Sequence, residues 1–347
     1  MVPARVILEQ GEVFEGMCPM WQDDSYFGEV VFNTGMTGYV ESLTDPSYAG
    51  QILTFTFPLI GNYGVPGPDL WESYKIQASG AVFCEISESY SHYQAQKSLQ
   101  EWLFEQRIPF ITGVDTRALT KCLRTKGVSL GVITKGKKAP QHFVDPNISH
   151  LVAGVSVKEP KIYGNGKKKI IAVDCGMKEN IIRSLLKFPV TVKRVPYDYN
   201  YLNEDFDGVF ISNGPGDPVV CSETVEILQK ALLLKKPVFG ICLGCQLMGL
   251  AIKAKTFKLP YGHRGHNQPC MHEGTTRAYL TSQNHGYAID EKSIPQDWKV
   301  TFRNLNDDSI EGIEHKSLPY FSVQFHPEAA PGPTDTMWLF EKFYGLL

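Results

Sequence analysis

The sequence lacks three features that would each point to a particular class of protein: a long apolar run, a strong net charge and a leader peptide. No stretch of about 18 consecutive apolar residues occurs, so the sequence predicts no membrane-spanning helix. The formal net charge is only −3 over 347 residues, which gives no overall attraction to nucleic acid or to an anionic membrane. The first residues, MVPARVILEQGEVFEG, have the character of neither a signal peptide nor a transit peptide. We therefore expect a cytoplasmic globular protein.

The cysteines are not spaced as a disulfide framework or as a zinc site. Eight are present, at positions 18, 84, 122, 175, 221, 242, 245 and 270. Several lie inside apolar segments such as AVFCEI and IIAVDCGM, which is typical of buried thiols in a reducing compartment. Cys242 and Cys245 form a C-x-x-C pair, but no second such pair and no H-x-x-x-H accompanies it. We therefore expect no metal site in this chain.

The first half of the chain is rich in strand signals. β-Branched and aromatic runs alternate with Gly/Pro turns, and RVILEQGEVFEG has the pattern of a hairpin that turns at Gly11. Helical patterns cover residues 93–107 and 115–127, and the second begins with an Asp-Thr cap signal and ends at Gly127. This mixture predicts an α+β domain.

The second half has a different pattern. Apolar strands alternate with amphipathic helices, as in KKIIAVDCG followed by MKENIIRSLLKF. This alternation predicts an α/β domain with a mainly parallel, helix-covered central sheet, which binds ligands at the carboxyl ends of its strands. Between the halves, SVKEPKIYGNGKK loses periodicity and is rich in Pro, Gly and Lys. The predicted organisation is a domain at 1–155, a linker at 156–168 and a domain at 169–347.

The segment GICLG (240–244) has the pattern of a nucleophile elbow, with Cys242 where hydrolases place serine. Glycines are needed on both sides because the turn from strand to helix is too tight for side chains. A cysteine at a helix N-terminus has a lowered thiol pKa, which favours the reactive thiolate. A small buried residue in a tight turn is the plain alternative. A redox dithiol with Cys245 is less favoured, because the pair is embedded in the elbow glycines.

A general base and an orienting carboxylate follow a later strand in VQFHPE (323–328). His326 and Glu328 are two residues apart in a segment that Pro327 holds extended, so both side chains point the same way. With Cys242 they would make a nucleophile–base–acid triad. A loop histidine beside a solvated glutamate is the alternative reading of these two residues alone.

Two glycine-containing loops bear on anion binding. NGPGDP (213–218) can turn backbone N–H groups toward the elbow as one side of an oxyanion hole, with the N–H of Leu243 on the other side. GVITKGKK (131–138) approaches a phosphate-binding loop but has Lys138 where Ser or Thr would bind Mg²⁺. We therefore expect no ATP site in this chain.

With Cys242, QFHPE and NGPGDP in this arrangement, residues 169–347 resemble the class I (triad) glutamine amidotransferases. The first half contains FNTGMTGYVESLTDPSYAGQILTFTFPLIGNYG and GVDTRALTKCLRTKG, which resemble the N-terminal domain of the small, glutamine-hydrolysing subunit of carbamoyl phosphate synthetase. RGHNQP (264–269) and SQNHGYA (282–288) fit the same family.

The resemblance implies a mechanism. Cys242 attacks the carboxamide of L-glutamine, N–H groups near Gly214 and on Leu243 hold the oxyanion, and His326 moves the protons. A γ-glutamyl thioester forms, and water then releases glutamate. The family's glutamine contacts carry over onto Ser47, Gly214, Gly216, Leu243, Gln246, Asn284, Gly286 and Tyr287. Because Ser47 belongs to the first domain, the resemblance implies a pocket where the two domains meet.

The resemblance also implies a partner for the ammonia that is released. A large synthetase component, separate or fused, would make carbamoyl phosphate from bicarbonate and two ATP for pyrimidine or arginine biosynthesis. ATP and Mg²⁺ are expected on that component, and no cofactor is expected in this chain. Two positions depart from the family: Cys245 replaces a usual His and Tyr287 a usual Phe. A non-catalytic scaffold is the alternative, but the retained Cys242 predicts glutamine hydrolysis.

Overall fold

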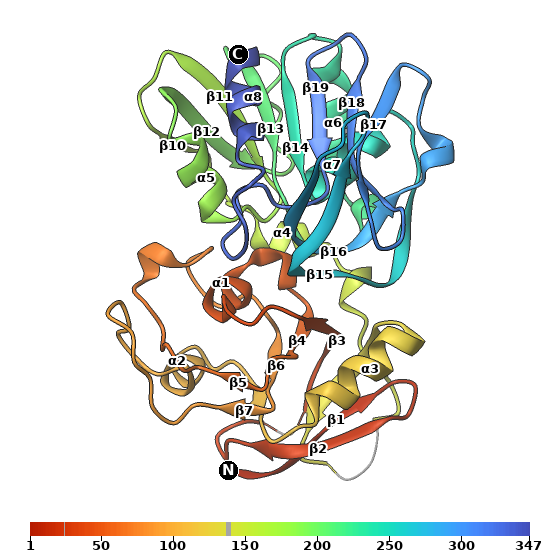
Figure 1. The fold of residues 1–347 in the computed structure, drawn as a ribbon. Coiled ribbons are helices and arrows are strands. Elements are labelled where there is room, and N and C mark those ends of the chain that lie inside the picture. The colour runs from red at the N-terminus through yellow and green to blue at the C-terminus, as the bar shows by residue number, and fades with distance from the viewer. Residues whose placement is uncertain (24, 137–139) are drawn as a thin grey trace. The chain divides into compact units, whose positions relative to one another are not determined.

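The computed structural model describes residues 1–23, 25–136 and 140–347. The chain forms two compact units, Met1–Ser149 and His150–Leu347 (Figure 1). Lys138, the last residue of the candidate phosphate-binding segment 131–138, lies outside the described residues. The first four residues of that segment, 131–134, belong to a strand that ends at Thr134.

The first unit is built on a mixed sheet. Within the described residues its strands, in sheet order, are β2 (Val13–Cys18), β1 (Val2–Leu8), β9 (Ser129–Thr134), β3 (Ser25–Asn33), β4 (Gln51–Phe55), β6 (Gly80–Val82) and β8 (Phe110–Ile111). The strands from β3 to β8 are parallel, and the others are antiparallel. The remaining elements are α1 (Tyr39–Thr44), α2 (Leu99–Glu105), α3 (Thr116–Lys126), the 3-10 helices η1 (Pro46–Tyr48), η2 (Pro68–Leu70) and η3 (Pro146–Ile148), and the small pair β5 (Leu59–Ile60) and β7 (Glu85–Ile86).

Local signals in this unit are partly confirmed. β1 and β2 pair antiparallel around the predicted turn at Gly11. α3 begins where the Asp115 carboxylate accepts a hydrogen bond from the N–H of Ala118 at 2.8 Å, and it ends at Gly127 with φ +93°.

The predicted helix over 93–107 is wrong at its start. α2 begins after Ser98, where the side chains of Ser98 and Glu101 cap each other's backbone N–H groups. The residues just before it are extended, because Gln96 and Lys97 exchange backbone hydrogen bonds with Val65. A partner distant in the sequence therefore overrides the helical pattern.

The second unit contains a larger sheet with a parallel centre. In the described residues its strands, in sheet order, are β10 (Lys161–Tyr163), β12 (Val190–Pro196), β11 (Lys168–Asp174), β13 (Gly208–Ile211), β14 (Val238–Ile241), β19 (Tyr320–Val323), β18 (Ile310–His315), β17 (Trp298–Asn304), β15 (Thr256–His272) and β16 (Ala278–Ile289). The helices are α4 (Leu151–Val155), α5 (Glu179–Leu185), α6 (Ser222–Leu232), α7 (Leu243–Ala251) and α8 (Trp338–Leu346), with the 3-10 helices η4 (Pro218–Val220) and η5 (Glu291–Ser293).

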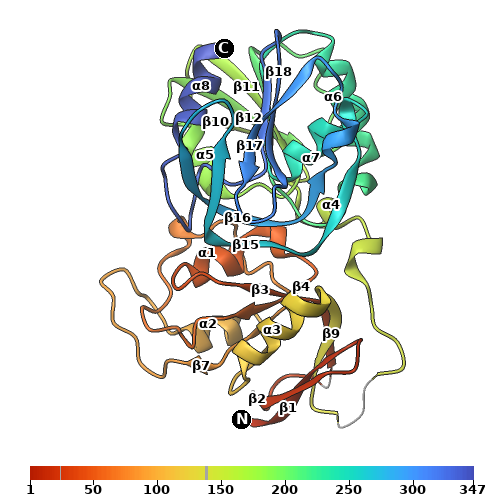
Figure 2. The same cartoon turned by 45° about the vertical axis from the view of Figure 1, so that its right-hand side comes forward.

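Helices cover both faces of the parallel centre, as the alternating pattern predicts (Figures 1 and 2). Alternate residues of β13 enter different cores: Ile211 joins a cluster with Leu228 of α6 and Leu247 of α7, whereas Phe210 joins another with Phe340 of α8. This alternation follows from the period of two in a strand.

The sheet as a whole is mixed rather than mainly parallel. The five strands from β12 to β19 are parallel, but β18, β17, β15 and β16 continue the sheet antiparallel. These strands come as two hairpins whose short turns force antiparallel pairing. The segment predicted as a linker, 156–168, contains β10, which pairs with β12.

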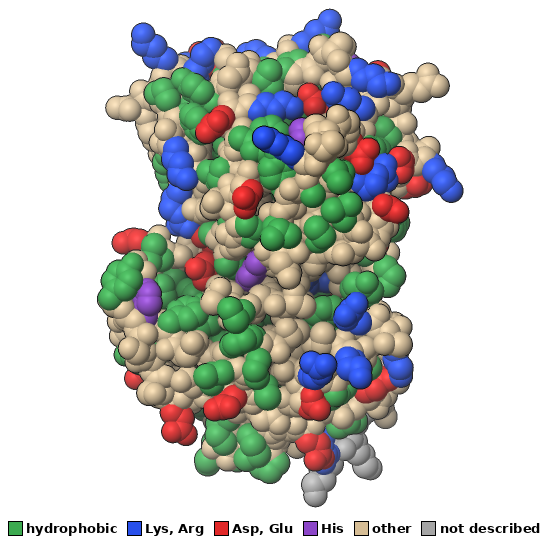
Figure 3. All heavy atoms as spheres, viewed as in Figure 1, with side chains coloured by type: hydrophobic (Ala, Val, Ile, Leu, Met, Phe, Trp, Pro, Cys, Tyr) green, Lys and Arg blue, Asp and Glu red, His purple; other side chains and the backbone are tan. Residues whose placement is uncertain are grey.

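The exterior carries both signs of charge. On the face in Figure 3, Lys and Arg side chains lie among Asp and Glu side chains rather than in one patch of a single sign. Across the part of the chain that the structure describes, we find no helix with the length and apolar character needed to cross a membrane.

Candidate active site

Cys242 occupies a sharp turn between β14 and α7. Its backbone has φ +55° and ψ −106°, a conformation that costs a residue with a side chain about 1–3 kcal/mol and is found mainly at functional sites. A Cβ added at Gly240 would lie 2.5 Å from the carbonyl oxygen of Gly244, and one at Gly244 would lie 2.2 Å from that of Ile211. The turn itself therefore requires Gly240, as the elbow pattern predicts, whereas Gly244 is required by the close approach of β13.

His326 and Glu328 form a buried pair just beyond β19. The predicted extended segment is wrong here, because residues 326–329 form a turn in which the N–H of Ala329 donates to the His326 carbonyl at 3.1 Å. The imidazole Nδ1 lies 2.6 Å from Glu328 Oε1, and both residues are at most 2% exposed. A carboxylate at Nδ1 favours a hydrogen on that nitrogen, so Nε2 is left to accept a proton. Among the described residues, Nε2 of His326 has no hydrogen-bond partner although it is buried. The pair can therefore act as an oriented base.

Lys178 completes this pair. Its Nζ lies 3.1 Å from Glu328 Oε1, with side-chain exposures of 3% and 0%, and it also donates to the carbonyl of Ala329. Burial alone would raise the pKa of Glu328, but the charge of Lys178 and the hydrogen bond from His326 outweigh it and lower the pKa to about 2. Glu328 is therefore ionised at neutral pH.

The strand β16 links the cysteine to the histidine. The backbone N–H of Cys242 donates to the Val323 carbonyl at the end of β19, 2.9 Å away. The N–H of His326 donates to the Ser282 carbonyl at 2.8 Å, and the thiol of Cys242 donates to the Asn284 carbonyl at 3.6 Å. Ser282 and Asn284 are two residues apart in one strand, so their backbone carbonyls point toward the same edge of that strand. Nucleophile and base thus lie at the carboxyl edge of the same parallel strands.

The loop after β13 packs against the start of α7. A Cβ at Gly214 would lie 2.0 Å from the Cys175 carbonyl and 2.8 Å from the Leu243 side chain, so only glycine fits there. Gly216 has φ +85°, which also favours glycine. Leu243 is the first residue of α7, and its N–H is among the helix donors that lack an intrahelical acceptor. The N–H of Leu243 is therefore a candidate backbone donor beside Cys242.

The other predicted contacts in this unit meet along β16. Gln246 of α7 donates through Nε2 to the Tyr287 carbonyl at 3.0 Å and to Gln324 Oε1 at 3.2 Å. Asn284, Gly286 and Tyr287 all lie in β16. The structure therefore brings these residues to the strand that touches Cys242.

Ser47 lies in the first unit. It is buried in η1, and its N–H donates to Asp45 Oδ1 at 2.9 Å. Its prediction as a glutamine contact stays a prediction.

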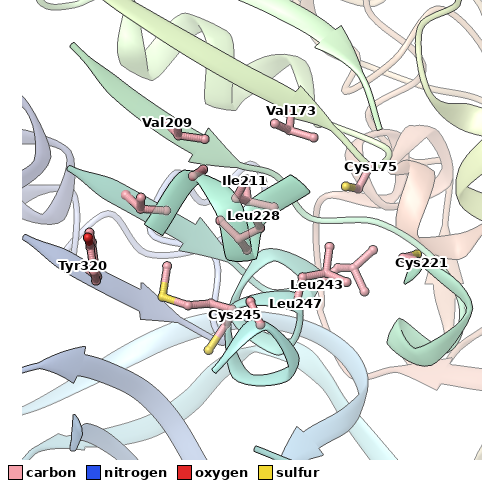
Figure 4. Close-up of a cluster of buried hydrophobic side chains, with 14 of the residues drawn as sticks. Val173, Cys175, Val209, Ile211, Cys221, Leu228, Leu243, Cys245, Leu247 and Tyr320 are labelled. Atoms are coloured by element: carbon pink, nitrogen blue, oxygen red, sulfur yellow. The ribbon is translucent and has the colours of Figure 1, made fainter. Parts of the chain in front are cut away.

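Cys245 is a core residue rather than a partner of Cys242. It packs in the cluster that includes Ile211 and Leu247 (Figure 4), whereas Cys242 belongs to the other hydrophobic cluster of the unit. The Ser322 hydroxyl donates to its sulfur at 3.2 Å. Burial raises the pKa of the Cys245 thiol to about 12, so it stays protonated at neutral pH. This environment does not suit a redox dithiol.

Two features were missed from the sequence. Lys178 was not identified, although a lysine four residues after the end of the buried strand β11 was a possible signal. The second is a buried group of His263, His285 and Glu311, whose donor atoms all lie within 4.8 Å of one another. Their wide separation along the chain hides them from a search for short ligand spacings.

Comparisons with known proteins agree with this architecture. The family model "Glutamine amidotransferase class-I" matches residues 171–346, and "Carbamoyl-phosphate synthase small chain, CPSase domain" matches residues 6–133. The multifunctional protein CAD of Squalus acanthias is 52% identical over 353 residues, which cover 98% of this chain and 16% of that protein. The multifunctional protein URA2 of Saccharomyces cerevisiae is 46% identical over 379 residues, 97% of this chain and 17% of that protein.

A shorter relative is matched over most of its own length. The carbamoyl phosphate synthase arginine-specific small chain of Aspergillus oryzae is 47% identical over 357 residues, 98% of this chain and 79% of that protein. The chain thus spans about a sixth of the two multifunctional relatives and most of the small chain. The chain belongs to the carbamoyl phosphate synthase small-chain family, and its second half to the class-I glutamine amidotransferases.

Proposed function

We propose that this chain hydrolyses L-glutamine to glutamate and ammonia, and that the ammonia supplies a carbamoyl phosphate synthetase component. One observation carries the proposal. A strained Cys242 at a helix N-terminus shares an edge of the sheet with a buried His326–Glu328 pair. This arrangement supports acyl transfer through a thioester, because nucleophile, base and orienting carboxylate are each held by backbone contacts or buried charges.

In the proposed reaction, the sulfur of Cys242 attacks the carboxamide carbon of glutamine while its proton passes to Nε2 of His326. N–H groups at Gly214 and Leu243 hold the oxyanion, and losing one such donor typically costs about 10²–10³ in rate. His326 then gives the proton to the departing ammonia, and a γ-glutamyl thioester remains. Water attacks the thioester with His326 as the base, which releases glutamate and restores the thiol. Glu328 keeps the imidazole oriented throughout.

The glutamine contacts are proposed to be the residues already named from the resemblance. In the second unit these are Gly214, Gly216, Leu243, Gln246, Asn284, Gly286 and Tyr287, and in the first unit Ser47. The tight packing of Gly214 on Leu243 and the hydrogen bond from Gln246 to β16 support this set for the second unit.

The synthetase component is proposed as the partner, with ATP and Mg²⁺ bound there and no cofactor in this chain. Relatives named as multifunctional proteins and one named as a small chain support either a fused or a separate arrangement. A cytoplasmic location and the domain limits 1–155 and 169–347 stay predictions.

The test measures glutamate released from glutamine by the chain with its synthetase component. Wild type should release glutamate and form an acid-stable γ-glutamyl adduct on the peptide that contains Cys242, detected by mass spectrometry. Cys242→Ala should abolish both. A non-catalytic scaffold predicts that wild type releases no more glutamate than Cys242→Ala. A redox dithiol predicts that Cys245→Ser is as inactive as Cys242→Ser, whereas the triad predicts a large loss only at Cys242.

A further inference from the structure

A buried ionic cluster lies behind the strand that contacts Cys242. His263 of β15 contacts Asp307 through Nε2 at 2.9 Å and Glu311 of β18 through Nδ1 at 3.2 Å. The side-chain amide of Asn304 donates to the same Glu311 oxygen at 3.1 Å, and Nε2 of His285 on β16 lies 3.7 Å from that oxygen. Glu311 is 0% exposed, and neither histidine exceeds 6%. Burying charged side chains costs desolvation free energy, so a buried cluster of this kind needs compensating contacts.

The charges in the cluster compensate one another. Burial alone would lower the pKa of His263, but hydrogen bonds to Asp307 and Glu311 outweigh it and raise the pKa to about 9. Burial lowers the pKa of His285, so this second ring stays neutral at pH 7. One imidazolium is therefore held between two carboxylates. A metal ion is disfavoured, because both nitrogens of His263 already contact carboxylate oxygens.

The cluster connects to the segment 284–287 through His285. Its Nδ1 lies 2.8 Å from the Tyr287 carbonyl, and because a carbonyl only accepts, Nδ1 carries the hydrogen. Nε2 of this neutral ring therefore has no hydrogen to donate to Glu311, and the ring instead packs edge-on against that of His263, with the centroids 4.9 Å apart. The same carbonyl accepts from Gln246 at 3.0 Å, so it is held from two sides. Within this segment the Asn284 carbonyl accepts the thiol of Cys242.

The backbone ladder holds this segment only weakly. β15 and β16 pair in register from His263 to Gly265, but the register shifts on both sides, after Lys258 and before Gln268. Only a short stretch of regular pairing therefore fixes residues 283–285 against β15. The side-chain cluster supplies the remaining constraint.

We propose that Glu311 is a positioning residue for glutamine binding: with Asp307 it holds His263, and His263, which pairs with His285 across β15 and β16 and packs its ring edge-on against that of His285, fixes the segment 284–287 beside Cys242. This inference rests on the proposed glutamine hydrolysis. It assigns Glu311 no contact with the reacting atoms, so its removal weakens glutamine binding more than it slows the chemistry.

The test compares steady-state glutamine hydrolysis by wild type and by Glu311→Gln, in the complex with the synthetase component. Glu311→Gln keeps the side-chain size but removes the charge. KM for glutamine should rise about tenfold or more while kcat falls less than about threefold. Glu314→Gln is the matched control, because Glu314 lies on the same strand, is 26% exposed and pairs with Lys342 at 3.1 Å. It should leave both constants unchanged.

The outcomes separate the two proposals. If wild type does not hydrolyse glutamine, the proposed function fails. If it does, and Glu311→Gln leaves KM at the wild-type value or lowers kcat alone, the positioning role is overturned. If Glu311→Gln does not fold, Asp307→Asn decides, since Asp307 is more exposed and should give a smaller KM increase of the same sign. Zinc bound stoichiometrically to wild type and absent from Glu311→Gln would overturn the proposal in favour of a metal site.

Discussion

Removing Lys178 from its ion pair with Glu328 would measure how much this pair stabilises the His326–Glu328 contact. Their charged atoms are 3.1 Å apart, and the side chains are only 3% and 0% exposed. Lys178→Met would remove the cation and leave the carboxylate buried. Breaking a buried pair from one side typically costs about 3–5 kcal/mol of unfolding free energy. We expect about 3 kcal/mol here, because His326 still contacts Glu328 and retains part of the compensation.

The same change should alter the pH dependence of glutamine hydrolysis. The pKa of Glu328 is lowered to about 2, so its contribution to stability is present above the ordinary value of 4.5 and is lost as the pH falls through 2. Without Lys178 that pKa rises. A protonated Glu328 would no longer favour the hydrogen on Nδ1 of His326, so the acid limb of kcat should move to higher pH.

Urea unfolding and glutamate release between pH 5 and 9 would test both effects. Lys169→Met is the matched control, because Lys169 of β11 also pairs with a carboxylate, Asp205 at 2.6 Å, but the two side chains are 52% and 85% exposed. That variant should cost no more than about 1 kcal/mol. If Lys178→Met lowers the unfolding free energy as little as Lys169→Met, or if the acid limb of kcat does not move, the Lys178–Glu328 pair does not orient His326.

Three further outcomes are expected. Gly244→Ala should destabilise the protein by about 2 kcal/mol or more in thermal unfolding, since its Cβ would lie 2.2 Å from a backbone carbonyl. The control Gly345→Ala places its Cβ where nothing lies within 4 Å, so it should leave the stability nearly unchanged. Iodoacetamide at pH 8 should alkylate Cys242 before Cys245, whose pKa is raised to about 12; peptide mapping that finds Cys245 labelled first would contradict this. Because the pKa of His263 is raised from 6.5 to about 9, its contribution to stability is full below pH 6.5 and is lost as the pH rises through 9, by up to about 3 kcal/mol; a flat stability profile over that range would refute it.

Predictions from the sequence succeed where the decisive contacts are local. The hairpin at Gly11, the capped helix α3 and the turn at Cys242 each depend on residues within a few positions of one another. The start of α2 was predicted wrongly because Val65, far away in the chain, pairs with the residues just before Ser98. The antiparallel half of the large sheet was missed for a related reason. Hairpin strands after residue 254 interrupt the strand–helix alternation on which the parallel prediction rested.

The sequence by itself determined the strained turn at Cys242 and the pairing of His326 with Glu328. The close approach of Gly240 to the Gly244 carbonyl and the separation of two residues around Pro327 are properties of short segments, whereas Gly244 is required by the carbonyl of Ile211 on a neighbouring strand. Only the tertiary structure decided how the buried charges are compensated. Lys178 meets Glu328 across 150 positions of the chain, and Glu311 meets His263 across 48. Hydrophobic periodicity encodes which face of an element is buried, but it does not encode which distant charge that face will meet.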